Sequence, residues 1–190
     1  MIPDHPVPGR PRAGRPRPAN SVLAAIEFLL LDVDGVLTDG RIWFGPDGHE
    51  YKSFHVHDAA GMFAWHREGG QSGFLSGRAG ETVERRAKEL GVHEVMLRRT
   101  DKGPALDEML ARRNLDPMRI CYVGDDLVDL PVMRRVGFAV TVPEARHEVF
   151  AAAQHVTERS AGFGVVRDVI EILLQARGRW QAVLDRYEKP

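Results

Sequence analysis

Residues 28–36 read FLLLDVDGV, a run of four apolar residues followed by two aspartates, Asp32 and Asp34, that stand two positions apart. A short continuous apolar run that ends in a turn signal is typical of a strand covered on both faces of a parallel sheet. Ligands of such sheets bind in the crevice at the carboxyl ends of the strands. The stretch therefore predicts that Asp32 and Asp34 lie at the edge of a sheet where a substrate arrives.

The composition indicates one globular domain. The chain has 190 residues, of which 43% are hydrophobic and 28% are charged, enough for one substantial core and too few for two ordinary domains. No apolar run approaches the ~20 residues needed to cross a bilayer, so a membrane role is not expected. The single cysteine, Cys121, lies in an apolar run, which favours a buried thiol in a reducing cytoplasm over a catalytic one.

The first twenty residues differ from the rest of the chain. They contain four arginines and six prolines against one aspartate, so they are basic while the remainder carries net negative charge. Because proline interrupts helices and strand ladders, and this segment has little to bury, residues 1–20 are expected to be disordered. An anion-binding arm is the alternative. Residues 21–190 are expected to form the single domain.

Strand and helix patterns alternate beyond residue 36. A turn at residues 45–48, GPDG, separates the β-prone runs 41–44 and 51–56 and predicts a hairpin. Helices are expected from Asp58, as N-cap, to residue 68, over 80–91, from about residue 102 and over 165–176, and further strands near 73–75, 92–97, 120–123 and 138–142. This alternation predicts an α/β fold with a doubly wound, mostly parallel sheet, into which the β-hairpin is inserted.

Polar residues occupy four positions that a doubly wound sheet would bring to one crevice. They are the pair Asp32 and Asp34, then Ser76, then Lys102, and finally the acidic loop with Asp125, Asp126 and Asp129. Carboxylates gathered within a few ångströms raise each other's pKa unless a cation joins them. Mg²⁺, which takes oxygen ligands and shares phosphate oxygens, suits such a sparse site. Lys102 and Ser76 would then supply positive charge and a hydroxyl donor to a phosphoryl group.

These residues resemble the four motifs of the haloacid dehalogenase superfamily of phosphatases. Further stretches resemble the capless 3-deoxy-D-manno-octulosonate 8-phosphate phosphatase family: DGVLTDG at 34–40, KSFHV at 52–56, SGR at 76–78, GDD at 124–126, DLPVM at 129–133 and VVRD at 165–168. The resemblance covers about residues 25–180. It implies a Rossmann-like fold and Mg²⁺-dependent hydrolysis of a phosphorylated keto sugar acid through an aspartyl-phosphate intermediate.

The resemblance also implies roles for the acidic residues. Asp32 would attack phosphorus, and Asp34 would protonate the departing sugar oxygen and then accept a proton from water. The Asp32 carboxylate, the Asp34 backbone carbonyl and the Asp125 carboxylate would hold Mg²⁺. Asp126 and Asp129 would orient these ligands or their water rather than bind the ion directly.

Three positions are implied to contact the substrate. Ser76 and Lys102 would complete the catalytic set around the phosphoryl group. Beyond them, Gly77, Arg78 and Arg86 would bind the substrate, with Arg78 the better candidate for the carboxylate of the sugar.

The chain has no room for a cap domain of the kind that shields the site in most members of the superfamily. Only about thirty-five residues separate Asp39 from Ser76, enough for a hairpin and one helix. In the resembled family, hairpins of four subunits form a central barrel and neighbouring chains cover each site. A homotetramer is therefore expected, with Trp43, Phe44 and Tyr51 as hairpin contacts. The alternative is that these aromatic residues pack on their own domain.

Two departures from the family pattern leave the sugar open. Residues 57–61 read HDAAG where the family commonly shows RDGxG, and residues 161–164 read AGFG where it usually shows two glycines, a lysine or arginine, and a glycine. Two positive charges that could meet an anionic sugar acid are thus absent. The octulosonate 8-phosphate is expected first, and N-acylneuraminate or deaminoneuraminate 9-phosphate is the alternative.

Three other interpretations are less favoured. A phospho-receiver signalling domain combines similar residues, but its lysine comes late in the chain, whereas Lys102 precedes the acidic loop here. A noncatalytic nucleic-acid binder would have to rely on the arginine-rich tail, because the body is acidic. His55 and His57 would share one strand face, yet no third metal ligand stands at a recognisable spacing. Surface or interface packing is expected for that pair.

Overall fold

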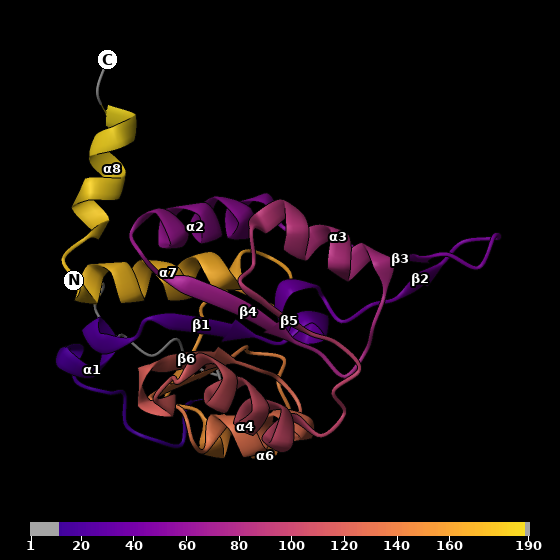
Figure 1. The fold of residues 1–190 in the computed structure, drawn as a ribbon, viewed down its shortest axis with the longest axis horizontal. Helices are drawn as coiled ribbons and strands as arrows, with labels where there is room; N and C mark the ends of the chain where they lie inside the picture. The colour runs from indigo at the N-terminus through magenta and orange to yellow at the C-terminus, as the bar shows by residue number, and fades with distance from the viewer. Residues whose placement is uncertain (1–11, 189–190) are drawn as a thin grey trace.

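The computed structural model of the chain describes residues 12–188. In this range six parallel strands form one sheet in the order β5-β4-β1-β6-β7-β8 (Figure 1). The strands are β1 (Phe28–Leu31), β4 (Gln71–Leu75), β5 (Glu94–Met96), β6 (Ile120–Val123), β7 (Phe138–Thr141) and β8 (His155–Val156). The chain adds strands on one side of β1 and then on the other, so the strand order reverses at β1. The predicted α/β fold with a doubly wound parallel sheet is confirmed.

Helices cover both faces of the sheet, and the strands supply both cores in alternation. Leu29 and Leu31 of β1 pack with one set of helices, whereas Phe28 and Leu30 pack with the other. The first set is α1 (Asn20–Ala25), α2 (Val56–Arg67), α3 (Glu81–Leu90) and α7 (Val165–Ala176). The second set is α4 (Lys102–Arg113), α5 (Leu130–Met133) and α6 (His147–Ala152). Burial of every residue of β1 explains its continuous apolar sequence.

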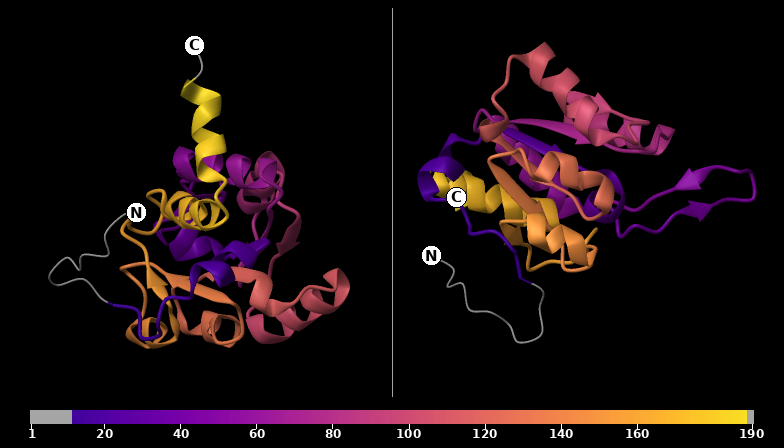
Figure 2. Two further views of the ribbon diagram at one scale, coloured as in Figure 1. Left: turned by 90° about the vertical axis from the view of Figure 1, so that its left-hand side faces the viewer. Right: turned by 90° about the horizontal axis from the view of Figure 1, so that it is seen from below.

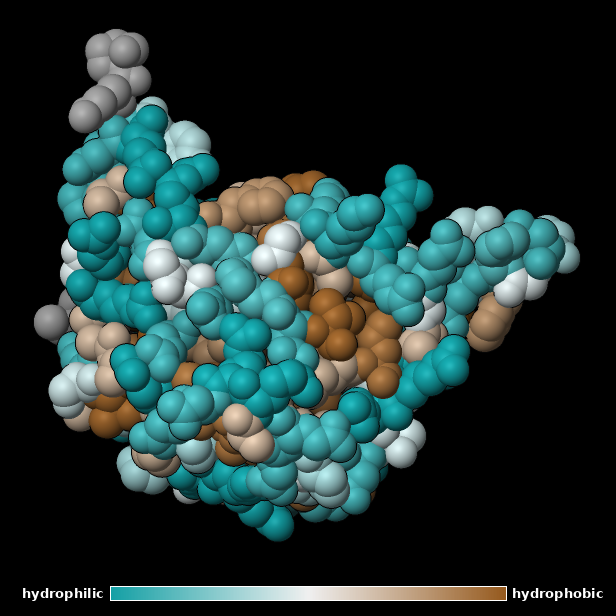
Figure 3. Space-filling model, viewed as in Figure 1, coloured by the Kyte–Doolittle hydropathy of each residue, from teal (hydrophilic) through white to brown (hydrophobic). Residues whose placement is uncertain are grey.

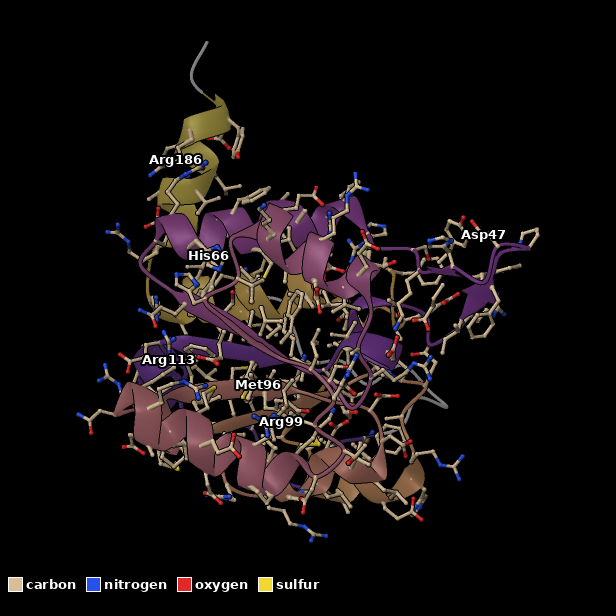
Figure 4. The ribbon with its side chains drawn as sticks, turned by 45° about the vertical axis from the view of Figure 1, so that its right-hand side comes forward. Asp47, His66, Met96, Arg99, Arg113 and Arg186 are labelled. Atoms are coloured by element: carbon tan, nitrogen blue, oxygen red, sulfur yellow. The ribbon has the colours of Figure 1, made fainter. Side chains whose placement is uncertain are left out.

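The expected hairpin is present and projects from the body (Figures 1 and 2). It pairs β2 (Trp43–Phe44) with β3 (Glu50–Tyr51), and Trp43 stands opposite Tyr51. Asp47 lies near its far end, well away from the sheet (Figure 4). Trp43, Phe44 and Tyr51 are 64%, 71% and 54% exposed, so these aromatic residues do not pack on their own domain.

The hairpin and the following helix differ from expectation at their boundary. The second strand stops at Tyr51 instead of continuing to residue 56, and α2 starts at Val56 with His55 as its N-cap. Asp58 is therefore not the cap of its own helix. Its buried carboxylate accepts the backbone N–H of Arg167 at 2.9 Å, near the start of α7. An acidic group at a helix start is favourable, and here the recipient helix is more than one hundred residues away.

Several short or terminal elements were not predicted. They are α1, α5, α6, β8 and α8 (Trp180–Glu188), the last of which extends away from the body at the C-terminal end (Figure 1). The start of α8 lies against the end of α2, because the guanidinium of Arg179, directly before α8, contacts Glu68, directly after α2, at 2.7 Å. Within residues 12–188, no helix is both long and apolar enough to span a membrane.

Part of the segment expected to be disordered is packed on the domain. The Gly14 N–H donates to Phe150 O at 2.6 Å, and the Arg15 N–H donates to Ala153 O at 2.9 Å. The Arg15 guanidinium also donates to Met133 O and Ala152 O, at the ends of α5 and α6. At these two positions the proline-rich segment is packed on the domain, because backbone hydrogen bonds and one arginine anchor it there. The same expectation covers residues 1–11, which lie outside the described residues.

Candidate active site

The sequence-predicted polar positions meet at one edge of the sheet. Asp32 follows β1 directly, Ser76 follows β4, and Asp125 follows β6 after one glycine. Leu31 is in parallel register with both Phe74 of β4 and Val123 of β6, so the three strands end side by side. This edge lies where the strand order reverses, which is the position of ligand crevices in open α/β sheets.

Lys102 lies at the centre of the site. It is the first residue of α4, and its side chain is only 1% exposed. Its ammonium is 2.9 Å from Asp32 Oδ2 and 2.6 Å from Asp129 Oδ1. Burial alone would lower the pKa of Lys102, but the attraction of Asp32 and Asp129 outweighs it and the pKa is raised. The two carboxylates therefore favour the charged form of Lys102.

Asp129 holds the acidic loop in shape. Its Oδ2 accepts the backbone N–H groups of Asp125 at 2.8 Å and Asp126 at 3.0 Å. Its Oδ1 accepts from Lys102 and, at 2.6 Å, from the hydroxyl of Tyr122. A carboxylate with four donors has little capacity left for a metal ion, although its oxygens lie within 4.8 Å of those of Asp32 and Asp125.

Asp32 and Asp125 are the carboxylates that remain open to a cation. Asp125 Oδ1 is buried and has no hydrogen-bond partner among the described residues. Burial, together with the charges of Asp32 and Asp129, raises the pKa of Asp125 to about 8. Burial also raises the pKa of Asp32, because Lys102 does not offset the loss of water together with the negative charge of Asp129. A hard divalent ion would relieve both effects, so these residues fit a metal site.

Gly35 explains how the turn after β1 comes against the acidic loop. Its φ is +88°, a conformation that favours glycine. A Cβ atom there would lie 2.3 Å from Asp125 Oδ2, so the Asp125 carboxylate would have to move away. The glycine therefore allows the Asp34–Gly35 turn to approach Asp125 closely.

Asp34 belongs to a second set of charges at the base of the hairpin. Lys52 contacts its Oδ1 and also lies 3.2 Å from Glu50 Oε1. Arg78 donates to Glu50 Oε2 at 2.7 Å, and its Nε lies 4.0 Å from Asp34 Oδ2. The hairpin thus reaches the second aspartate of the first motif through two cations.

The remaining predicted site residues have different surroundings. Ser76 is buried, and its Oγ accepts the backbone N–H of Arg78 at 3.2 Å. The loop of Ser76 is supported by the backbone N–H of Arg99, which donates to Ser76 O at 3.0 Å and follows β5 (Figure 4). At Gly77 a Cβ would have ordinary contacts with Thr100, so close packing does not require glycine there.

Arg86 is not joined to the carboxylate cluster by any contact among the described residues. Its guanidinium donates to His55 O at 3.3 Å and to Glu89 at 3.0 Å, and it lies over the ring of Phe54. These contacts hold the segment between the hairpin and α2. His55 and His57 stack edge to face at 4.7 Å, and they do not belong to a cluster of three metal-ligating side chains within residues 12–188.

Three residues of the site were not singled out from the sequence: Glu50, Lys52 and Tyr122. Lys52 stands in a stretch that resembles the family, but neither strand ends nor spacing mark it. Tyr122 lies inside a buried strand, where its sequence context predicts only packing. Both reach the site through tertiary contacts.

Comparison with known proteins agrees with this geometry. A family profile described as haloacid dehalogenase-like hydrolase matches residues 75–169. The chain belongs to the haloacid dehalogenase-like hydrolases. A phospho-receiver domain is thereby excluded.

Individual relatives define the family to which the chain belongs within this class of hydrolases. The 3-deoxy-D-manno-octulosonate 8-phosphate phosphatase of Escherichia coli K12 is 38% identical over 154 residues, 81% of this chain and 82% of that protein. The chain belongs to the 3-deoxy-D-manno-octulosonate 8-phosphate phosphatase family. The Moraxella catarrhalis enzyme, solved with magnesium, phosphate and the octulosonate, superposes with a TM-score of 0.87 at 32% identity, covering 89% of this chain and 97% of that one.

A third relative carries a different metal. The cobalt-bound Haemophilus influenzae phosphatase superposes with a TM-score of 0.79 at 34% identity, covering 83% of this chain and 92% of that one. Divalent cations are therefore bound by two of these similar proteins.

Proposed function

We propose that this protein is a Mg²⁺-dependent phosphomonoesterase whose preferred substrate is 3-deoxy-D-manno-octulosonate 8-phosphate. The observation that carries the proposal is the set of Asp32, Asp125 and Lys102 at one sheet edge, with an unpartnered buried oxygen on Asp125. This is a site for an anion and a divalent cation together. The family relationship supplies the class of sugar.

In the proposed reaction Asp32 attacks phosphorus, the bond from phosphorus to the sugar oxygen breaks, and an aspartyl phosphate forms. Asp34 delivers a proton to the departing oxygen, which would otherwise leave as an unstable alkoxide. Water then attacks the same phosphorus and gives its proton to Asp34, which releases phosphate and restores Asp32.

The other residues hold charge around the phosphoryl group. Lys102 and the Ser76 hydroxyl would contact the phosphoryl oxygens. The Asp32 and Asp125 carboxylates and the Asp34 backbone carbonyl would hold Mg²⁺, which neutralises the carboxylates and polarises the phosphoryl oxygens when bound.

Substrate recognition is assigned to the charged base of the hairpin. Arg78 is half-exposed and shared with Glu50, so it can turn toward a sugar carboxylate. Gly77 and Arg86 were also implied as substrate contacts, and the bonds of Arg86 to the 54–55 segment favour a supporting role for it. The family pattern has a cation at positions 57 and 163, and this chain lacks both. N-acylneuraminate and deaminoneuraminate 9-phosphates are therefore the second candidates for the substrate.

We further infer a homotetramer assembled through the hairpins, in the cytoplasm. The exposed Trp43, Phe44 and Tyr51 lie on a hairpin whose tip projects away from the rest of residues 12–188 (Figure 2). Apolar side chains are also exposed on the body beside the base of the hairpin (Figure 3). Exposed apolar surface of this kind is typical of an interface. Sedimentation of the wild type and a Trp43→Ser, Phe44→Ser variant would test it, and a monomeric wild type would refute it.

The function is tested by incubating purified protein with a panel of sugar phosphates, with Mg²⁺ or with EDTA. The panel includes the octulosonate 8-phosphate, both 9-phosphates and hexose phosphates. We expect Mg²⁺-dependent phosphate release with the highest kcat/KM for the octulosonate ester. Equal turnover of all esters, or turnover in EDTA, would contradict the proposal.

A further inference from the structure

Tyr122 places a hydroxyl group in the core beside the site. The residue lies in β6, in register with Leu30 of β1, and is fully buried. Its ring packs in the core on the face covered by α4, α5 and α6. A phenylalanine would fill the same space, so packing alone does not account for the hydroxyl. A buried hydroxyl needs hydrogen-bond partners, and those of Tyr122 are charged.

The hydroxyl of Tyr122 lies between two groups of the site. It donates to Asp129 Oδ1 at 2.6 Å and accepts from Lys102 Nζ at 3.2 Å. Burial and the carboxylates of Asp129 and Asp32 raise the pKa of Tyr122, so the hydroxyl keeps its proton. Lys102 thus has three acceptors for its three protons: Asp32, Asp129 and Tyr122.

Asp129 transmits this arrangement to the acidic loop. While Oδ1 receives Tyr122 and Lys102, Oδ2 receives the backbone N–H groups of Asp125 and Asp126. Rotation of the carboxylate would break both sets of bonds at once. Gly124 permits this close approach, because a Cβ there would lie 2.5 Å from Asp129 Cγ.

We propose that the Tyr122 hydroxyl is a positioning group that fixes the Asp129 carboxylate. Through Asp129 it holds Asp125 and Lys102 in position relative to Asp32. Tyr122 does not contact the reacting atoms. The inference rests on the proposed function for its effect on turnover, but its effect on the loop is independent of any substrate. Without the hydroxyl, one Lys102 N–H lacks an acceptor and Asp129 Oδ1 loses one of its two donors.

The test is Tyr122→Phe in the full chain, read out by amide hydrogen exchange and by steady-state kinetics. Loss of one hydrogen bond to a charged group corresponds to a factor of about ten to one hundred. We expect amide exchange at residues 125 and 126 to accelerate by about that factor in substrate-free protein. We also expect kcat for the octulosonate ester to fall by about the same factor, with KM changed less than about threefold.

The matched control is Ser72→Ala. Ser72 is also buried, its hydroxyl pairs with His66 Nε2 at 2.7 Å, and it lies at the opposite end of β4 from Ser76. This variant should lose stability while keeping wild-type kcat and wild-type exchange at residues 125 and 126. An equal fall of kcat in both variants would overturn the proposal, because it would show a general effect of core destabilisation.

A second comparison makes Asp129 the test. In an Asp129→Asn background, Tyr122→Phe should change amide exchange at residues 125 and 126 by less than about twofold, since Tyr122 acts on these residues through the hydrogen bonds of Asp129. A full additional effect there, or unchanged exchange in the Tyr122→Phe single variant, would refute the inference. If the wild type turns over no phosphate ester, the proposed function fails while the exchange measurements still decide the role of Tyr122.

Discussion

The ammonium group of Lys102 lies 2.9 Å from Asp32 Oδ2, and the side chains of both residues are less than 10% exposed. The two residues are seventy positions apart in the sequence. They meet because α4 starts at the sheet edge where β1 ends. A buried cation beside a buried carboxylate orients that carboxylate and attracts an anionic substrate, and the first two predictions below depend on this pair.

Replacing Asp32 with asparagine should abolish turnover and leave the fold intact. The change is nearly isosteric, but it removes the proposed nucleophile, so we expect kcat to fall by about three orders of magnitude or more. Phosphate release and circular dichroism would be measured in parallel. Asp47→Asn, an exposed position at the hairpin tip, serves as the control. Near-normal activity of Asp32→Asn would remove Asp32 from its assigned role.

Replacing Lys102 with methionine should reduce stability as well as activity. It leaves Asp32 and Asp129 buried without their cation, and breaking a buried pair in this way costs about 3–5 kcal/mol. Urea unfolding measures the free energy, and Lys88→Met on the exposed face of α3 is the matched control. A Lys102→Met protein as stable as the wild type would show that the carboxylates are neutral in the native state.

The stability of the metal-free protein should depend on pH through Asp125. Its pKa rises from 3.8 in the unfolded chain to about 8 in the folded protein, so the folded state binds more protons between these values. Stability from this group is complete below pH 4 and is lost as the pH rises toward 8. Mg²⁺ replaces the proton, so the gain in Tm from Mg²⁺ should increase from pH 5 to pH 8.

The comparison that isolates this effect is Asp125→Asn. Other groups titrate in the same range, among them Asp58, whose pKa burial raises to about 6, and His66, whose pKa burial lowers to about 4. The contributions of Asp58 and His66 cancel when the two proteins are compared under the same conditions. A gain in Tm from Mg²⁺ that is independent of pH, or that persists in Asp125→Asn, would argue against Asp125 as a metal ligand.

Lys52→Gln should slow the reaction without unfolding the protein. The Lys52 side chain is only 1% exposed and joins Asp34 to Glu50, so its loss frees the proposed acid and base to rotate. We expect kcat to fall about tenfold to a hundredfold, because a general acid–base group that is out of position catalyses proton transfer less well. Lys88→Gln is the control. Unchanged kcat with a raised KM would instead make Lys52 a binding residue.

Arg15→Ala should destabilise the domain and leave turnover unchanged. The guanidinium donates to the carbonyl groups of Met133 and Ala152 at two helix ends, contacts that contribute about 1–2 kcal/mol together. Thermal unfolding would be compared with Arg17→Ala, which has no side-chain bond to the domain among the described contacts. Equal Tm values for the two variants would show that the backbone bonds of Gly14 and Arg15 alone anchor the segment.

The parts that the sequence predicted well are local or follow from sheet topology. The apolar run before Asp32 indicated a strand buried on both faces, and alternation with helices placed Asp32, Ser76 and Asp125 at parallel strand ends. Predictions failed where a residue acts on a distant element. Asp58 is of a residue type common at N-caps and was expected to cap its own helix, α2. Its carboxylate instead accepts a backbone N–H at the start of α7, because α7 packs beside α2. Arg15 stands in a proline-rich segment, but it bonds to helix ends that no local pattern reveals.

The amino-acid sequence by itself determined the fold class and the sheet edge at which the acidic residues gather, because periodicity and strand ends are local properties of the chain. Only the tertiary structure decided which of those carboxylates is satisfied and which is open to a cation. It also decided that Lys52 reaches Asp34 and that Tyr122 reaches Asp129. Hydrogen bonds of buried groups depend on atoms brought together from distant segments, and burial sets their strength.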